Sequence, residues 1–199
     1  MSRVCRCTAI AACVMALVVS VGCGSSPTRF YALSALPQGG GFAGAAARSG
    51  PALGIGPVSV PERLNRPEIV TWVNDNMLHL AEFDVWAAPL HDSITRVLAE
   101  NLSVLLPTDR AAIFPWPSDS PMDYEVRAEI ARFDGTLGRE CSLIARWSIL
   151  RRADKQTKVG RSSHTEPAGD TYTTFVAAQS RLVAALSRDI AAALGAGGW

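Results

Sequence analysis

Residues 124–151 read YEVRAEIARFDGTLGRECSLIARWSILR, and this stretch decides the fold of the chain. Apolar residues occupy every second position from residue 124 to residue 130, and they alternate again from residue 141 to residue 149. A period of two is that of a β-strand with one buried face. The stretch therefore predicts two half-buried strands, joined by a turn that begins near Asp134-Gly135.

The sequence on either side of this pair predicts more strands. Short apolar segments bounded by Gly, Pro, Asn or Asp are typical of strands. Asn74-Asp75-Asn76 tolerates the positive φ of a tight turn, so the segments around it predict a hairpin. The further predicted strands span residues 29–33, 53–61, 68–73, 77–86, 111–116 and 158–165.

Two segments have the apolar period of an amphipathic helix. One runs from Pro89, which a first helical turn tolerates, to Pro107; the other follows Asp170 or Thr171, either of which can cap it. The order of elements predicts an α+β domain, in which a mainly antiparallel, mixed sheet carries two long helices on one face. Without alternating strand–helix units, a doubly wound dinucleotide-binding fold is disfavoured.

The N-terminus has the layout of an export signal. Arg3 and Arg6 precede an apolar run over residues 8–21, which is shorter than the roughly 20 residues that span a bilayer. The run ends at Gly22-Cys23, which resembles the bacterial lipobox, although Ser20 stands where leucine is usual. A secreted protein without lipid, or a buried first helix, is the alternative.

These features predict how the 199 residues are divided. We expect a signal peptide at 1–22, a lipidated tether at 23–28, and one globular domain at 29–199 with a flexible Gly/Ala-rich loop at 37–50. Cys23 would carry S-diacylglycerol and an N-acyl chain, and no other cofactor is expected. Of the remaining cysteines, only Cys141 would stay in the mature chain, so no disulfide is expected. Its place in the alternating pattern predicts a buried thiol.

Charge and motif spacing indicate no enzyme and no nucleic-acid partner. The net charge is +1, without a basic run. His79, His91 and His164 are too far apart in sequence to form a metal motif, so no metal site is expected. His91-Asp92-Ser93 contains the residue types of a catalytic triad, but neighbours on a helix point in different directions. No GxSxG motif occurs.

Acidic and aromatic residues provide the remaining candidates. Asp123, Glu125 and Glu129 can share a strand face, where the interleaved arginines predict a solvated, cross-paired surface rather than a glycosidase pair. Aromatic side chains near loops favour contact with another protein, and packing is the alternative. The candidate partner-binding residues are Tyr31, Trp72, Trp86 and Trp116.

Several short motifs, taken in their order and spacing, resemble the paraquat-inducible protein C family of ABC-type transport auxiliary lipoproteins. They are FYAL at 30–33, GPVSVP at 56–61, WAAPL at 86–90 and EIARFDG at 129–135. The resemblance implies a non-enzymatic lipoprotein on the periplasmic face of the outer membrane. It also implies a partner with mammalian-cell-entry (MCE) domains, similar to paraquat-inducible protein B, in a lipid transport system that maintains envelope integrity. A homo-oligomeric ring is plausible if the partner is a ring.

A different class of function is left open by the sequence. A periplasmic carrier would hold a lipid or another small ligand between the sheet and the helices, and it would need a large apolar cavity there. Large aromatic side chains such as Trp147 and Phe175 are expected to fill that space.

Overall fold

The computed structural model describes residues 27–37, 49–117 and 119–196. The predicted signal peptide, Cys23 and most of the predicted loop at 37–50 lie outside these residues. The elements, in chain order, are β1 (Arg29–Tyr31), β2 (Leu53–Ser59), the short 3-10 helix η1 (Glu62–Leu64), β3 (Glu68–Asn74), β4 (Met77–Trp86), α2 (Leu90–Leu105), β5 (Ala111–Ile113), β6 (Tyr124–Gly135), β7 (Glu140–Arg151), β8 (Thr157–Pro167) and α3 (Tyr172–Gly195).

The predicted α+β fold class is confirmed, with its strands divided between two sheets. A five-stranded sheet has the order β5-β2-β6-β7-β8, and a three-stranded sheet has the order β1-β4-β3. The opening stretch forms the antiparallel pair β6–β7, and β8 continues it. Strand β2 pairs in parallel with both β5 and β6, so the larger sheet is mixed.

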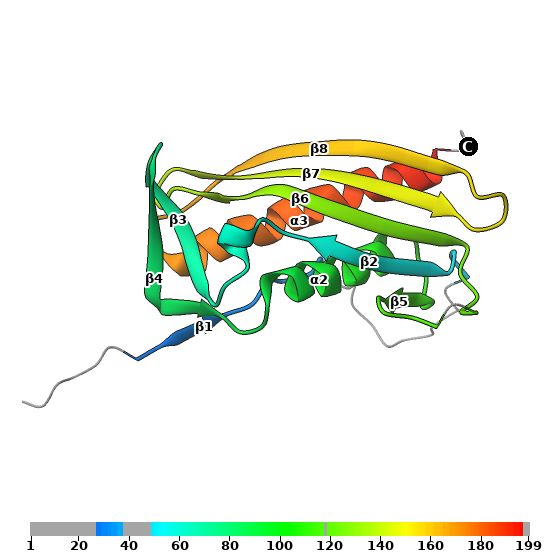
Figure 1. The fold of residues 1–199 in the computed structure, drawn as a ribbon, viewed down its shortest axis with the longest axis horizontal. Helices are drawn as coiled ribbons and strands as arrows, with labels where there is room; N and C mark the ends of the chain where they lie inside the picture. The colour runs from blue at the N-terminus through cyan, green and yellow to red at the C-terminus, as the bar shows by residue number, and fades with distance from the viewer. Residues whose placement is uncertain (1–26, 38–48, 118, 197–199) are drawn as a thin grey trace, which may run out of the picture.

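Both helices pack on the same face of the five-stranded sheet (Figure 1). Helix α3 lies against β7 and β8, α2 lies against β2, and the two helices contact each other. The alternating residues of β7 point into this layer, and Cys141, Leu143 and Ala145 are fully buried. Phe133 and Phe175 belong to the same core. No helix of the described residues is long and apolar enough to cross a membrane.

Several strands differ at their ends from the sequence predictions: β1 and β2 end two residues earlier than predicted, and β8 is longer than predicted. The strand expected over 111–116 ends at Ile113, before Pro115 and Pro117, which cannot donate a ladder hydrogen bond. Strand β6 ends at Gly135, where the turn was predicted to begin. Of the two predicted caps, Thr171 is the one that caps α3, because its hydroxyl accepts a hydrogen bond from the Thr174 amide at 3.3 Å.

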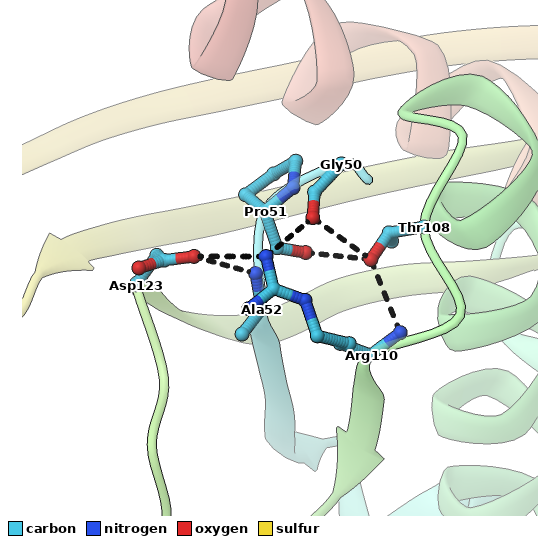
Figure 2. Close-up of polar contacts among 6 residues, drawn as sticks. All are labelled: Gly50, Pro51, Ala52, Thr108, Arg110 and Asp123. Carbon is cyan, nitrogen blue, oxygen red and sulfur yellow. Dashed lines mark hydrogen bonds and ion pairs between the residues drawn. The ribbon is translucent and has the colours of Figure 1, made fainter. Parts of the chain in front are cut away.

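The buried residue Thr108, which follows α2, forms hydrogen bonds with the segment that leads into β2 (Figure 2). The Thr108 hydroxyl is fully buried, donates to the Pro51 carbonyl at 2.8 Å, and accepts from the Arg110 amide at 3.1 Å. Arg110 also donates to the Gly50 carbonyl at 2.7 Å, and Asp123 accepts from the Ala52 amide at 2.7 Å. These bonds set where β2 enters the sheet after the predicted loop.

Candidate docking site

The three-stranded sheet forms one end of the molecule, and the C-terminal end of α3 lies at the other (Figure 1). The described chain begins here, because β1 pairs in parallel with β4, with Arg29 opposite Asp84 and Tyr31 opposite Trp86. This end is therefore the part of the domain that follows Cys23 in the chain. It also carries FYAL, the first of the family-like motifs.

Asp84 holds β1 in place. Its side chain is 7% exposed, and it accepts hydrogen bonds from the Arg29 guanidinium at 2.8 Å and from the Tyr31 hydroxyl at 2.7 Å. The Tyr31 ring lies 6.4 Å from the ring of Tyr172, at the start of α3. Desolvation and the contact with Asp84 raise the pKa of Tyr31, and the hydrogen bond to Asp84 raises the pKa of Arg29. The first strand is thus fixed to the domain by buried charge as well as by backbone pairing.

Large apolar side chains are exposed on this small sheet. Phe30 is 71% exposed, Val73 51%, Met77 49% and Leu80 41%. They come from all three strands of the small sheet. Phe30 lies beside Val85, near one end of β4, whereas Met77 begins the strand at its other end, so the exposed apolar side chains are spread along the small sheet. Exposed apolar surface can contact a protein or a membrane.

A polar cleft of about 590 Å³ separates the small sheet from the turn between β6 and β7. Arg63, Arg132, Arg139 and Trp72 line it. The Trp72 indole nitrogen is buried, and it has no hydrogen-bond partner among the described residues. A buried donor without a partner is unusual in native proteins. Trp72 is therefore the predicted aromatic candidate that the structure places in a cleft with unused hydrogen-bonding capacity.

A buried carboxylate lies beneath this cleft. The Asp134 side chain is fully buried and accepts hydrogen bonds from Arg63 at 2.7 Å and from Arg132 at 2.9 Å. Arg63 belongs to η1, which leads into β3, whereas Asp134 belongs to β6. The ion pair therefore connects the entry of the small sheet to the main sheet. Sequence reasoning missed this role, because Arg63 and Asp134 are 71 residues apart in the chain.

The other aromatic candidates pack within the domain. Trp86 is 7% exposed and belongs to the core. Trp116 is half-buried, and its ring meets Phe114 edge-on with centroids 5.3 Å apart. The Tyr31 hydroxyl donates a hydrogen bond to Asp84. These positions agree with the packing alternative, and direct partner contact by the three residues stays a prediction.

The acidic strand face is cross-paired, but part of it is buried. Glu125 is 5% exposed and forms ion pairs with Arg127 and Arg152. The expectation of a fully solvated face is therefore wrong for Glu125, although its pairing with arginine is confirmed. The reason is that Arg152, beyond the end of β7, reaches back across the sheet.

Among the described residues, no three His, Cys, Asp or Glu side chains lie close enough together to hold a metal ion. His91 contacts its neighbour Asp92 at 3.3 Å, on the surface of α2. A second cluster, which the sequence did not indicate, joins β8 to α3: Asp189 accepts from the Ser162 hydroxyl at 2.5 Å and contacts His164 at 2.7 Å. Ser162 and His164 both contact Oδ2 of Asp189. A nucleophilic relay requires the histidine to lie between the carboxylate and the hydroxyl, and His164 does not.

The space between the sheet and the helices is filled by side chains. Phe133, Phe175 and Leu182 are at most 1% exposed and belong to one continuous apolar cluster. This packing does not favour the carrier alternative, which needs an apolar cavity in that layer.

Two solved structures have the same fold. A crystal structure of an uncharacterized protein has a TM-score of 0.67 and 19% identity, covering 85% of this chain and 99% of that one. The protein XCC0632 from Xanthomonas campestris, of the DUF330 family, has a TM-score of 0.65 and 15% identity, covering 82% of this chain and 93% of that one. At these identities the similarity shows the fold alone.

Comparisons of sequence show the family. No curated protein matches this chain at a significant level. The family model for the ABC-type transport auxiliary lipoprotein component matches residues 31–191, from the last residue of β1 into α3. Its members are transport auxiliary lipoproteins, not a family of enzymes. The chain therefore belongs to the ABC-type transport auxiliary lipoprotein family, as its motifs predicted.

Proposed function

We propose that this protein is a docking subunit of an MCE-type lipid transport system, held by acyl chains on Cys23 at the periplasmic face of the outer membrane. The observation that carries the proposal is the family match over residues 31–191. The small sheet supports it, because this sheet combines the start of the domain with exposed apolar side chains and a polar cleft. In this role the protein positions a partner and performs no chemistry.

The length of the tether supports a location close to the membrane. Arg29 follows Cys23 by six residues, and such a segment spans at most about 20 Å when fully extended. Asp84 fixes β1 to β4, so the small sheet would stay within this reach of the lipid. Several acyl chains on one residue would make the attachment stable. A partner that connects to the inner membrane must then supply the remaining length.

The anchor is tested by replacing Cys23 in the full chain. We expect Cys23→Ala to move the protein from the outer-membrane fraction to the soluble periplasmic fraction, without changing its unfolding midpoint. Cys141→Ala is the matched control, since it removes a buried cysteine outside the tether, and it should remain with the membrane. If Cys23→Ala stays in the membrane fraction to the same extent as wild type, the anchor is wrong.

The docking surface is tested on the small sheet. We expect the double variant Val73→Gln/Met77→Gln to lose co-purification of an MCE-domain protein from the native envelope, because both side chains are about half exposed there. Ile113→Gln is the matched control, since Ile113 is 44% exposed on β5 of the other sheet. Equal loss in both variants, or in neither, would contradict docking through the small sheet.

Light scattering of the full chain measures whether a homo-oligomeric ring forms.

A further inference from the structure

The open face of the five-stranded sheet carries a groove that is separate from the docking site. Both helices lie on the opposite face (Figure 1). The groove has a volume of about 670 Å³ and crosses β2, β6, β7 and β8. Its lining includes Ser59, Arg127, Glu129, Arg146, Ser148 and Val159, together with Arg161.

The strand register places like charges next to one another in this groove. Glu129 of β6 is opposite Arg146 of β7, and Arg146 is opposite Arg161 of β8. Like charges directly opposite on neighbouring strands destabilise a sheet. In the part of the chain that the structure describes, neither Arg146 nor Arg161 has an ion-pair partner. An anion between the two guanidinium groups would relieve this repulsion.

Apolar surface lies directly beside the arginines. Val159 is 75% exposed and is separated from Arg161 by one residue of β8. Pro57 of β2 is also exposed, at the other side of the groove. Ser59 of β2 and Ser148 of β7, which is opposite Val159, also line the groove. The groove therefore offers positive charge, hydroxyl groups and apolar contacts together, as an amphiphilic anion would require.

We propose that this groove binds the phosphodiester headgroup of a glycerophospholipid, with the phosphate shared by Arg146 and Arg161. Guanidinium groups match phosphate oxygens in forked geometry. Directly opposite side chains on adjacent strands start about 5 Å apart, so two arginines can reach one phosphate. Carboxylates on one side of an extended acidic peptide are about 7 Å apart, which fits the pair less well. The significance for lipid transport rests on the proposed function, but the binding itself does not.

The test is a calorimetric titration of the full chain, in a non-ionic detergent, with dihexanoyl phosphatidylglycerol. We expect saturable binding that Arg146→Gln and Arg161→Gln each weaken by about tenfold, the effect of losing one charge-assisted hydrogen bond. Glu129→Gln should strengthen binding about twofold to fivefold, because it removes the competing carboxylate. Arg188→Gln, an exposed arginine of α3 outside the groove, is the matched control and should bind as wild type does.

Stability provides a second measurement. If the two arginines repel each other, Arg161→Gln should keep the unfolding midpoint or raise it by about 1–4 °C while binding is lost. A lower midpoint would mean that Arg161 has a structural role, which would overturn the argument from repulsion.

Three results would overturn the lipid proposal. Equal binding of inorganic phosphate would assign the groove to the free ion, and binding of a polyglutamate peptide but not of phospholipid would assign it to an acidic protein segment. Equal loss in Arg188→Gln would indicate only general electrostatic attraction. Membrane fractionation and co-purification of the MCE-domain protein by Arg146→Gln report on the proposed function separately, so the two ideas can fail independently.

Discussion

Cys141 illustrates how surroundings set the chemistry of a single residue. The alternating pattern predicted a buried thiol, and the structure confirms that Cys141 is free and fully buried between β7 and the helices. Burial raises the pKa of this thiol to about 11. A thiol in this environment stays protonated at neutral pH and is a poor nucleophile.

This shift predicts a loss of stability at alkaline pH. The raised pKa stabilises the folded state fully below the ordinary thiol value of 9.0, and that contribution disappears as the pH rises through about 11. We expect the free energy of unfolding, measured with urea, to fall between pH 9 and pH 11. In Cys141→Ala the fall should be smaller, although other groups such as Tyr31, whose pKa is also raised, still titrate. The same fall in both proteins would contradict this role of Cys141.

The pair β7–β8 depends on a close contact between Trp147 and Gly160. The two residues are directly opposite, and a Cβ added to Gly160 would lie 2.1 Å from the indole ring. The indole nitrogen donates to the Ser162 hydroxyl at 3.0 Å, which in turn donates to Asp189 of α3. The glycine therefore leaves the space that lets Trp147 join strand to helix.

A methyl group at this position tests that arrangement. We expect Gly160→Ala to lower the free energy of unfolding by about 1–3 kcal/mol, because the indole must move and its hydrogen bond must lengthen. Gly195→Ala is the control, since nothing lies within 4 Å of a Cβ at the end of α3. Urea unfolding followed by tryptophan fluorescence measures both. A Gly160→Ala protein as stable as Gly195→Ala would show that the indole moves at no cost.

Strand β6 shows where a simple period of two fails. Continued from residue 130, the alternation would point Arg132 into the core and Phe133 outward. A register shift between Ile130 and Arg132 reverses this order, so Phe133 is 1% exposed and Arg132 is at the surface. Bulges of this kind depend on the partner strand, and a single-strand pattern does not reveal them.

In the molecule as a whole, the ion pair between Arg63 and Asp134 is one of the contacts that join the two sheets, together with the packing of β3 against β6. The guanidinium of Arg63 is 37% exposed, whereas the carboxylate of Asp134 is completely buried. Loss of Arg63 leaves this carboxylate with Arg132 as its remaining ion-pair partner among the described residues. The small sheet would then be held less firmly against the main sheet.

We expect Arg63→Gln to lower the free energy of unfolding by about 1.5–3 kcal/mol, the range for a hydrogen bond to a charged group. Hydrogen exchange should increase in β3 and β4 but not in β7 and β8, because local opening follows local packing. Arg66→Gln is the matched control: its ion pair with Glu68 is at the surface, with both side chains more than 30% exposed, and should contribute less than about 1 kcal/mol. Uniform exchange changes in every strand would contradict a local link.

The sequence by itself determined the order of strands and helices, the buried face of β7 and the family, because periodicity and short motifs are local properties of the chain. Only the tertiary structure decided that the strands form two sheets, that Asp84 and Asp134 are buried carboxylates, and that Arg146 lies beside Arg161. Each of these depends on residues far apart in the chain, and on strand register, which one strand cannot specify without its neighbour. Trp72 and Trp86 make the same point: both flank the hairpin in sequence, yet one lines a cleft and the other lies in the core.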